Sequence, residues 1–113
     1  MSAITTHILD VSRGVTARGV PVVLERETSS GWEIIGKGAT DEDGRLRDLL
    51  DASAILKAGN YRLTFDTKMY FAGQQIESFY PQVVVAFTVQ DAAQHYHLPL
   101  LLSPFGYSTY RGS

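Results

Sequence analysis

Residues 95–113 read HYHLPLLLSPFGYSTYRGS and hold two of the three histidines of the chain together with its densest apolar run. A period of two residues, which is typical of a β-strand, sorts positions 95–103 into two faces. One face carries the apolar side chains expected in a core, and these are Tyr96, Leu98, Leu100 and Leu102. The other face carries His95, His97, Pro99 and Leu101. Because chain ends usually fray and this one stays aromatic almost to its last residue, we expect the terminus to be docked.

The same alternation recurs along the chain, with turn-forming residues between the segments. It predicts strands at residues 4–11, 20–27, 32–39, 61–66, 82–90, 95–103 and 107–111. Short strands at spacings near ten residues are typical of an antiparallel β-sandwich, so we predict an all-β fold and a single domain over residues 1–113. Residues 51–57 and 67–75 could each form a short helix. Trp32, Phe65 and Phe87 are expected in the core.

Composition excludes several classes of function. The chain has 113 residues and a formal net charge of −2, without the basic bias of a nucleic-acid binder. No apolar stretch is long enough to span a membrane and no leader resembles a signal peptide, so a cytoplasmic protein is expected. The chain has no cysteine, which excludes a thiolate nucleophile and a disulfide framework.

The three histidines, His7, His95 and His97, allow more than one interpretation. His95 and His97 could be surface residues beside an edge strand. All three could form a zinc site with an open fourth position. Alternatively, neutral imidazoles with pKa values near 6.5 would suit general acid and base catalysis at neutral pH. The spacing alone leaves these alternatives open.

Arg45 and the tail are the other candidates. The turn at residues 40–44 precedes Arg45, which could be a surface charge or a planar fork for an anionic or carbonyl-rich ligand. The tail that ends at Ser113 could be solvated, or it could offer donors and acceptors to a ligand.

Three motifs resemble the 5-hydroxyisourate hydrolases, the transthyretin-like proteins of purine catabolism. They are ITTHILD at residues 4–10, DGR at residues 43–45 and the whole of residues 95–113. The similarity runs across essentially the full chain. A Ser-Pro-aromatic-x-Tyr-Ser-Thr motif is shared with transthyretin, whereas the terminal Tyr-Arg-Gly-Ser marks the hydrolase branch. One minor departure is Thr16, where many members carry proline.

This resemblance implies a transthyretin-like sandwich of two four-stranded sheets. Its one short helix would follow the strand at 61–66, which favours residues 67–75. The resemblance also implies a homotetramer, a dimer of dimers, with active sites at the dimer–dimer interface. A second subunit would then cover the outward face of residues 95–103 and bury Pro99 and Leu101. No cofactor and no metal are implied.

The resemblance further implies the reaction and the residues that perform it. The substrate would be 5-hydroxyisourate, opened by water to 2-oxo-4-hydroxy-4-carboxy-5-ureidoimidazoline. The catalytic set falls on His7, Arg45, His97 and Ser113, and the substrate-binding set falls on Tyr110, Arg111 and Gly112. We expect the histidines to move the proton of the water, Arg45 to bind the ring oxygens, and the tail to close the pocket. The alternative is a transthyretin-type carrier of small molecules, a class that lacks these residues together.

Overall fold

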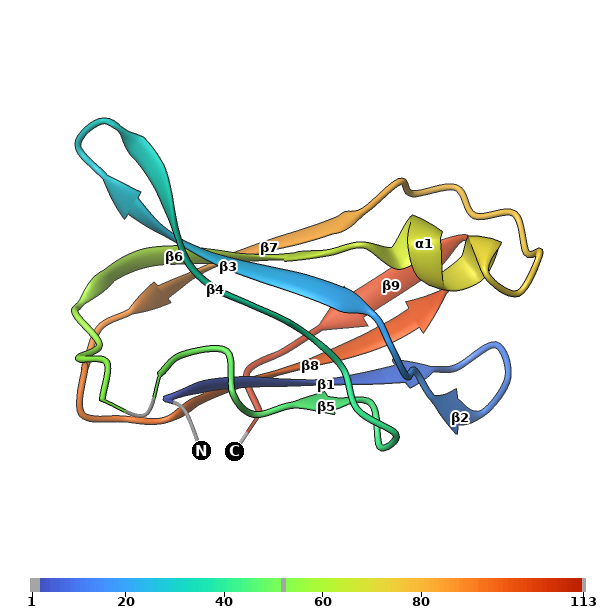
Figure 1. Ribbon diagram of the computed structural model, residues 1–113, viewed down its shortest axis with the longest axis horizontal. Helices are drawn as coiled ribbons and strands as arrows, with labels where there is room; N and C mark the ends of the chain where they lie inside the picture. Colours follow the sequence, from blue (N-terminus) through green and yellow to red (C-terminus); the bar gives the residue numbers. More distant parts are fainter. Residues whose placement is uncertain (1–2, 52, 113) are drawn as a thin grey trace.

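The computed structural model describes residues 3–51 and 53–112 as two stacked β-sheets with a short helix at one end (Figure 1). Within these residues the chain forms nine strands and one helix. The elements are β1 Ile4–Asp10, β2 Val15–Thr16, β3 Pro21–Thr28, β4 Gly31–Ala39, β5 Arg45–Leu46, β6 Gly59–Phe65, α1 Thr67–Ala72, β7 Val83–Val89, β8 Tyr96–Ser103 and β9 Gly106–Thr109. The predicted all-β sandwich with one short helix is confirmed.

The first sheet has the strand order β2-β1-β8-β9, and the second has the order β4-β3-β6-β7. The first sheet has five strands rather than the expected four, because the two-residue strands β2 and β5 share one edge of β1. Every pairing is antiparallel except that of β1 with β8, which is parallel. A parallel pair needs a long connection, and here most of the chain separates the two strands.

The helix α1 follows β6, as the resemblance implied. The carboxylate of Asp66 accepts a hydrogen bond from the backbone N–H of Met69 at 3.1 Å, which caps the helix. After the helix, the N–H of Gly73 donates to the carbonyl of Met69 at 3.1 Å. The alternative helix at 51–57 is wrong, because residues 51 and 53–57 form no helix and residue 52 lies outside the described part. No helix in residues 3–51 and 53–112 is long and apolar enough to cross a membrane.

The core lies between the sheets, where the alternating side chains of both sheets meet. The faces predicted for β8 are confirmed, since Tyr96, Leu98, Leu100 and Leu102 are all buried. The core prediction is confirmed for the buried Phe65, and Phe87 packs against the core as a partly buried side chain. The core prediction is wrong for Trp32, which is half-buried. The guanidinium carbon of Arg62 lies over its ring, 4.3 Å from the ring centroid.

A buried carboxylate ties the helix to β1. Asp10 is fully buried, and its Oδ1 accepts hydrogen bonds from the hydroxyl and the backbone N–H of Ser12. Its Oδ2 accepts a hydrogen bond from the Tyr70 hydroxyl at 2.7 Å. Burial and this hydrogen bond raise the pKa of Tyr70. A buried carboxylate depends on such donors, because an unsatisfied one is costly.

We therefore expect Tyr70→Phe to lower the free energy of unfolding by about 1–3 kcal/mol, because the Asp10 carboxylate loses a donor that water cannot easily replace. Urea denaturation followed by tryptophan fluorescence measures this change. Tyr80→Phe is the control, because the Tyr80 hydroxyl makes no hydrogen bond within residues 3–51 and 53–112. Equal stabilities of the Tyr70 variant and the wild type would contradict the prediction.

Candidate active site

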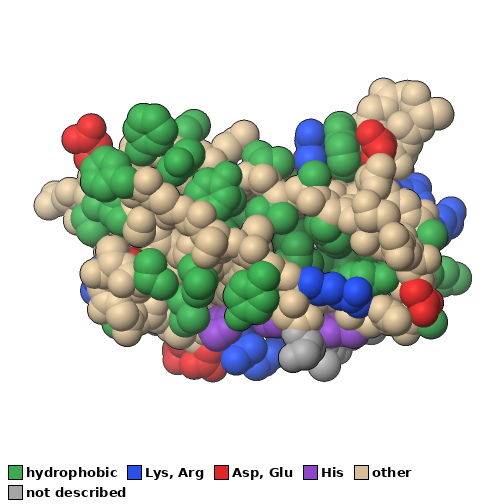
Figure 2. Space-filling view, turned by 180° about the vertical axis from the view of Figure 1, so that it is seen from behind, with side chains coloured by type: hydrophobic (Ala, Val, Ile, Leu, Met, Phe, Trp, Pro, Cys, Tyr) green, Lys and Arg blue, Asp and Glu red, His purple; other side chains and the backbone are tan. Residues whose placement is uncertain are grey.

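The strand register gathers the candidate residues on the outer face of the first sheet. Thr5 of β1 lies directly beside His97 of β8, and His7 of β1 lies beside Arg45 of β5. Residues paired in this way project to the same side of a sheet. The histidines therefore gather along the lower edge of Figure 2, next to a basic side chain. The outward direction predicted for His97 agrees with this arrangement.

The turn before β5 sets the position of Arg45. The Asp41 carboxylate accepts hydrogen bonds from backbone N–H groups within the turn, including that of Arg45 at 3.0 Å. Gly44 has φ +72° and its carbonyl accepts from the N–H of Ile8 at 2.8 Å. A Cβ at Gly44 would collide with the Ile8 carbonyl, so the close approach of the turn to β1 requires glycine here. The turn thus fastens Arg45 beside His7.

The Arg45 guanidinium keeps its charge available. Its residue is half-buried, and none of the ion pairs among the described residues includes it. A guanidinium that makes no ion pair with the described residues is suited to bind the oxygens of an anionic or carbonyl-rich ligand.

Burial and the charge of Arg45 both act on the two histidines. Burial, followed by the nearby Arg45 charge, lowers the pKa of His97 from its ordinary value of 6.5, and His95 and His7 add to the effect. The same two causes lower the pKa of His7, although the backbone carbonyl of Asp43 and the acidic residues of the turn oppose them. Both shifts favour the neutral form of the rings at neutral pH, in which a ring nitrogen can accept a proton.

Thr5 is a site residue that the sequence analysis missed. Its Oγ1 lies 2.8 Å from Nδ1 of His97 and 3.1 Å from Nε2 of His95, between two rings whose centroids are 6.4 Å apart. Within residues 3–51 and 53–112, Nε2 of His97 makes no hydrogen bond. That nitrogen is the one left for a water or a substrate. The available signal was the position of Thr5 two residues before His7, on the same strand face.

The tail is docked against His97, as the sequence predicted. The N–H of Gly112 donates to the carbonyl of His97 at 2.8 Å. A Cβ at Gly112 would lie 2.8 Å from Cδ2 of His97 and 3.1 Å from Cγ of Pro99, so a side chain has no room there. The structure thus brings Gly112 directly against His97, whose ring also lies within reach of the charges of Arg45 and His7.

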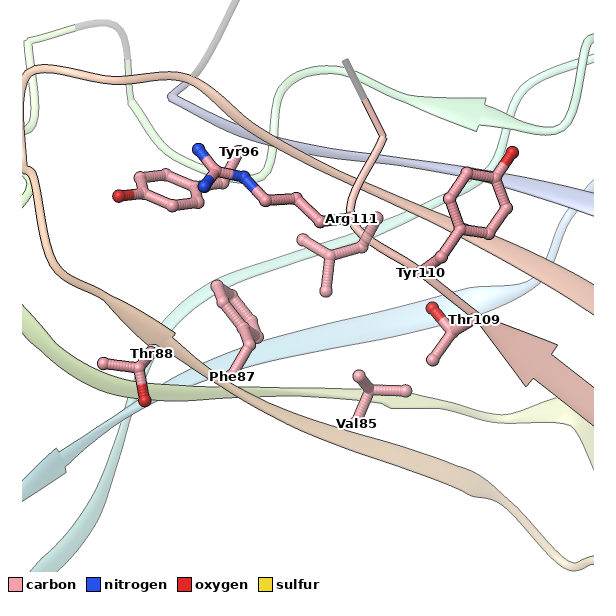
Figure 3. Close-up of a pocket in the computed structure, with 8 residues that line it drawn as sticks. Val85, Phe87, Thr88, Tyr96, Thr109, Tyr110 and Arg111 are labelled. Atoms are coloured by element: carbon pink, nitrogen blue, oxygen red, sulfur yellow. The ribbon is translucent and has the colours of Figure 1, made fainter.

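The structure does not bring Arg111 to this cluster. Its guanidinium carbon lies 4.5 Å from the ring centroid of the core-facing Tyr96, and its Nη2 donates to Oε1 of Gln94 at 2.7 Å. There Arg111 lines a pocket between β7 and the tail, together with Phe87 (Figure 3). The exposed Tyr110 side chain points in a different direction from that of Arg111. Ser113 lies outside the described residues.

The zinc alternative finds no support in the geometry. In the described ranges 3–51 and 53–112, no group of three or more His, Cys, Asp or Glu side chains could hold a metal ion. His95 and His97 instead both contact the Thr5 hydroxyl.

Comparisons with known proteins cover nearly the whole chain. A sequence model of the HIUase/Transthyretin family matches residues 4–112. The 5-hydroxyisourate hydrolase of Mus musculus is 45% identical over 114 residues, which cover 99% of this chain and 96% of that protein. The structure of Klebsiella pneumoniae 5-hydroxyisourate hydrolase matches with a TM-score of 0.85 and 40% identity, over 97% of this chain and 92% of that chain. Sea bream transthyretin in complex with thyroxine matches with a TM-score of 0.91 and 34% identity, over 98% of this chain and 95% of that chain.

We expect Arg45→Gln to raise the pKa values of both His7 and His97, because removal of the positive charge makes protonation of the nearby rings less costly. In the wild type both should titrate below 6.5. Histidine ¹H–¹⁵N NMR spectra recorded against pH measure these values. Arg47→Gln is the matched control, because the exposed Arg47 is not among the causes of either shift. Unchanged or lowered values in Arg45→Gln would contradict the assignment.

Proposed function

This chain belongs to the HIUase/transthyretin family, and we propose that it hydrolyses 5-hydroxyisourate on the outer face of its first sheet. One observation carries the proposal. His7 and His97 come from opposite ends of the chain, yet His7 pairs with Arg45 across β1 and β5, β8 lies along the other edge of β1, and the charge of Arg45 acts on both rings. Fold stability alone does not require two neutral imidazoles and a guanidinium on a half-buried face.

The histidines supply the base for the attacking water. Burial and the Arg45 charge lower the pKa of His97, which favours its neutral form at neutral pH. Its Nε2 makes no hydrogen bond within residues 3–51 and 53–112, and it can accept a proton as the water attacks the ring carbonyl. His7, whose pKa is also lowered, is the second group for proton transfer, to or from the opened ring. Proton transfer by a positioned side chain contributes roughly 10²–10⁴-fold to a rate.

Arg45 and the tail orient the substrate. The Arg45 guanidinium binds the oxygens of the oxidised purine ring and offsets the negative charge that develops on the attacked carbonyl. Tyr110, Gly112 and Ser113 close the pocket over the substrate. The backbone contact between Gly112 and His97 supports this role for the tail. For Arg111 the support is the tail motif alone, because its side chain lies over Tyr96.

We further propose a homotetramer, a dimer of dimers, located in the cytoplasm. The catalytic face carries the half-buried Leu101 alongside the histidines, whereas Pro99, which a second subunit was expected to bury, is already buried within the single chain. A second subunit packed on this face would bury Leu101 and exclude water from the site. Within residues 3–51 and 53–112, the edge strands β7 and β9 each pair with a strand on one side only, so the other side could pair with another chain.

A carrier is the second candidate function. The likeness to sea bream transthyretin in complex with thyroxine favours it. A carrier would need the sandwich and the tetramer, but it would not need the cluster of His7, Arg45 and His97. Hydrolysis is therefore the function that the site supports best.

We expect the protein to accelerate the decay of the ultraviolet band of 5-hydroxyisourate, generated in situ from urate by urate oxidase. The acceleration should survive a chelator, because no step uses a metal. His97→Asn should lower kcat by at least about 100-fold, since it removes the base, whereas His95→Asn should cost much less. Equal losses in the two variants would contradict the assignment of His97 as the base. A folded wild-type tetramer without any acceleration would point to the carrier.

We expect four chains of 12.5 kDa per particle in light scattering after size exclusion. Leu101→Glu should yield dimers with reduced activity, because a carboxylate on the catalytic face would be buried without a partner. Ile34→Glu is the matched control, since the exposed Ile34 belongs to β4 of the second sheet, away from the edge strands proposed for pairing. A tetrameric Leu101→Glu variant would contradict the proposed interface.

A further inference from the structure

The Thr5 hydroxyl lies between two imidazoles that the proposed function treats differently. It contacts Nδ1 of His97 at 2.8 Å and Nε2 of His95 at 3.1 Å. Thr5 is only 3% exposed, and its backbone is the register partner of His97. A β-branched side chain has few χ1 rotamers, so the hydroxyl is held in place between the rings.

A hydroxyl has one proton, which limits how the three groups can be connected. In one arrangement Thr5 donates to Nδ1 of His97 and accepts from the N–H of His95, so His97 carries its proton on Nε2. In the other, Nδ1–H of His97 donates to Thr5, and Thr5 donates to Nε2 of His95. Of the two arrangements in which Thr5 donates to one ring and accepts from the other, the second leaves Nε2 of neutral His97 free to act as a base.

We propose that Thr5 is a positioning residue that joins His97 to His95 in a proton relay, an inference that rests on the hydrolase function proposed above. The attacking water gives a proton to Nε2 of His97 while its oxygen bonds to the substrate carbonyl. Nδ1 of His97 gives its proton to Oγ1 of Thr5, and the Thr5 hydroxyl gives its own proton to Nε2 of His95. The net result is a neutral His97, an unchanged hydroxyl and a protonated His95.

The charges around His97 explain why a relay is useful. Burial comes first among the causes that lower the pKa of His97, and the charges of Arg45, His95 and His7 add to it. No carboxylate among the described residues hydrogen-bonds to His97. A protonated His97 would therefore be half-buried beside a guanidinium without a counter-charge. His95 is exposed, so the relay moves the positive charge into water, where it is solvated.

Thr5→Val tests the relay, because valine keeps the shape of the side chain and removes the hydroxyl. We expect kcat to fall by about 10-fold, far less than in His97→Asn, with a smaller change in KM, and Thr5→Ser to restore most of the loss. In mixtures of H₂O and D₂O, kcat of the wild type should show the curved dependence of several moving protons, and that of Thr5→Val a linear one. A purely structural role of Thr5 would not alter this dependence. If Thr5→Val does not fold, the same measurements are made on Thr5→Ala, which also lacks the hydroxyl.

A double-mutant cycle tests whether His95 is the other end of the relay. Thr5→Val and His95→Asn should lower kcat by similar factors, and the double variant should lose little more than either one. Losses that multiply would overturn the relay. An active wild type whose kcat is unaffected by Thr5→Val would also overturn the relay, yet it would leave the proposed function intact. A wild type that does not hydrolyse 5-hydroxyisourate would overturn both.

Discussion

The parallel pairing of β1 with β8 is the constraint on which both the fold and the site depend. Its register runs without a break from Ile4 beside Tyr96 to Asp10 beside Leu102. The inward side chains of both strands supply the core on the side of the first sheet. On the outward face, the same register puts Thr5 beside His97. Since side chains alternate along a strand, a slip of one residue would expose the leucines and bury the histidines. Stability and proposed catalysis therefore select the same register.

Much of the fold could be predicted because its determinants are local. The alternation in β8 predicts which side chains face the core, and the turn with Gly44 is evident from composition. The helix was harder to place, because residues 51–57 and 67–75 are similarly apolar. Only the second has Asp66 in position to cap its first turn. The core prediction for Trp32 failed for a different reason. A large aromatic side chain can pack beneath a guanidinium at the surface instead of in the core.

The members of the candidate site could be named from the sequence, but their proximity could not be derived from spacing. His7 meets Arg45 because β5 pairs with the edge of β1, and it comes near His97 because β8 pairs with the other edge. Neither pairing has a local signal. Thr5 was missed because threonine is common in strands for its shape alone. The Arg111 side chain is oriented by its contacts with the ring of Tyr96 and the side-chain amide of Gln94. These residues are distant from Arg111 in sequence and contact it only in the folded chain.

The pairing of an early strand with a late one also has a consequence for the newborn chain. On the ribosome β1 emerges first, whereas β8 follows only after the whole second sheet has been synthesised (Figure 1). Until then the edge of β1 opposite β2 and β5 lacks its long partner, and the first sheet lacks the buried leucines of β8 that pack with Ile4 and Ile8 in the core. Such long-range pairings form slowly and leave strand edges open to other chains. The nascent protein thus passes through a period in which protection from aggregation depends on the cell and not on its own fold.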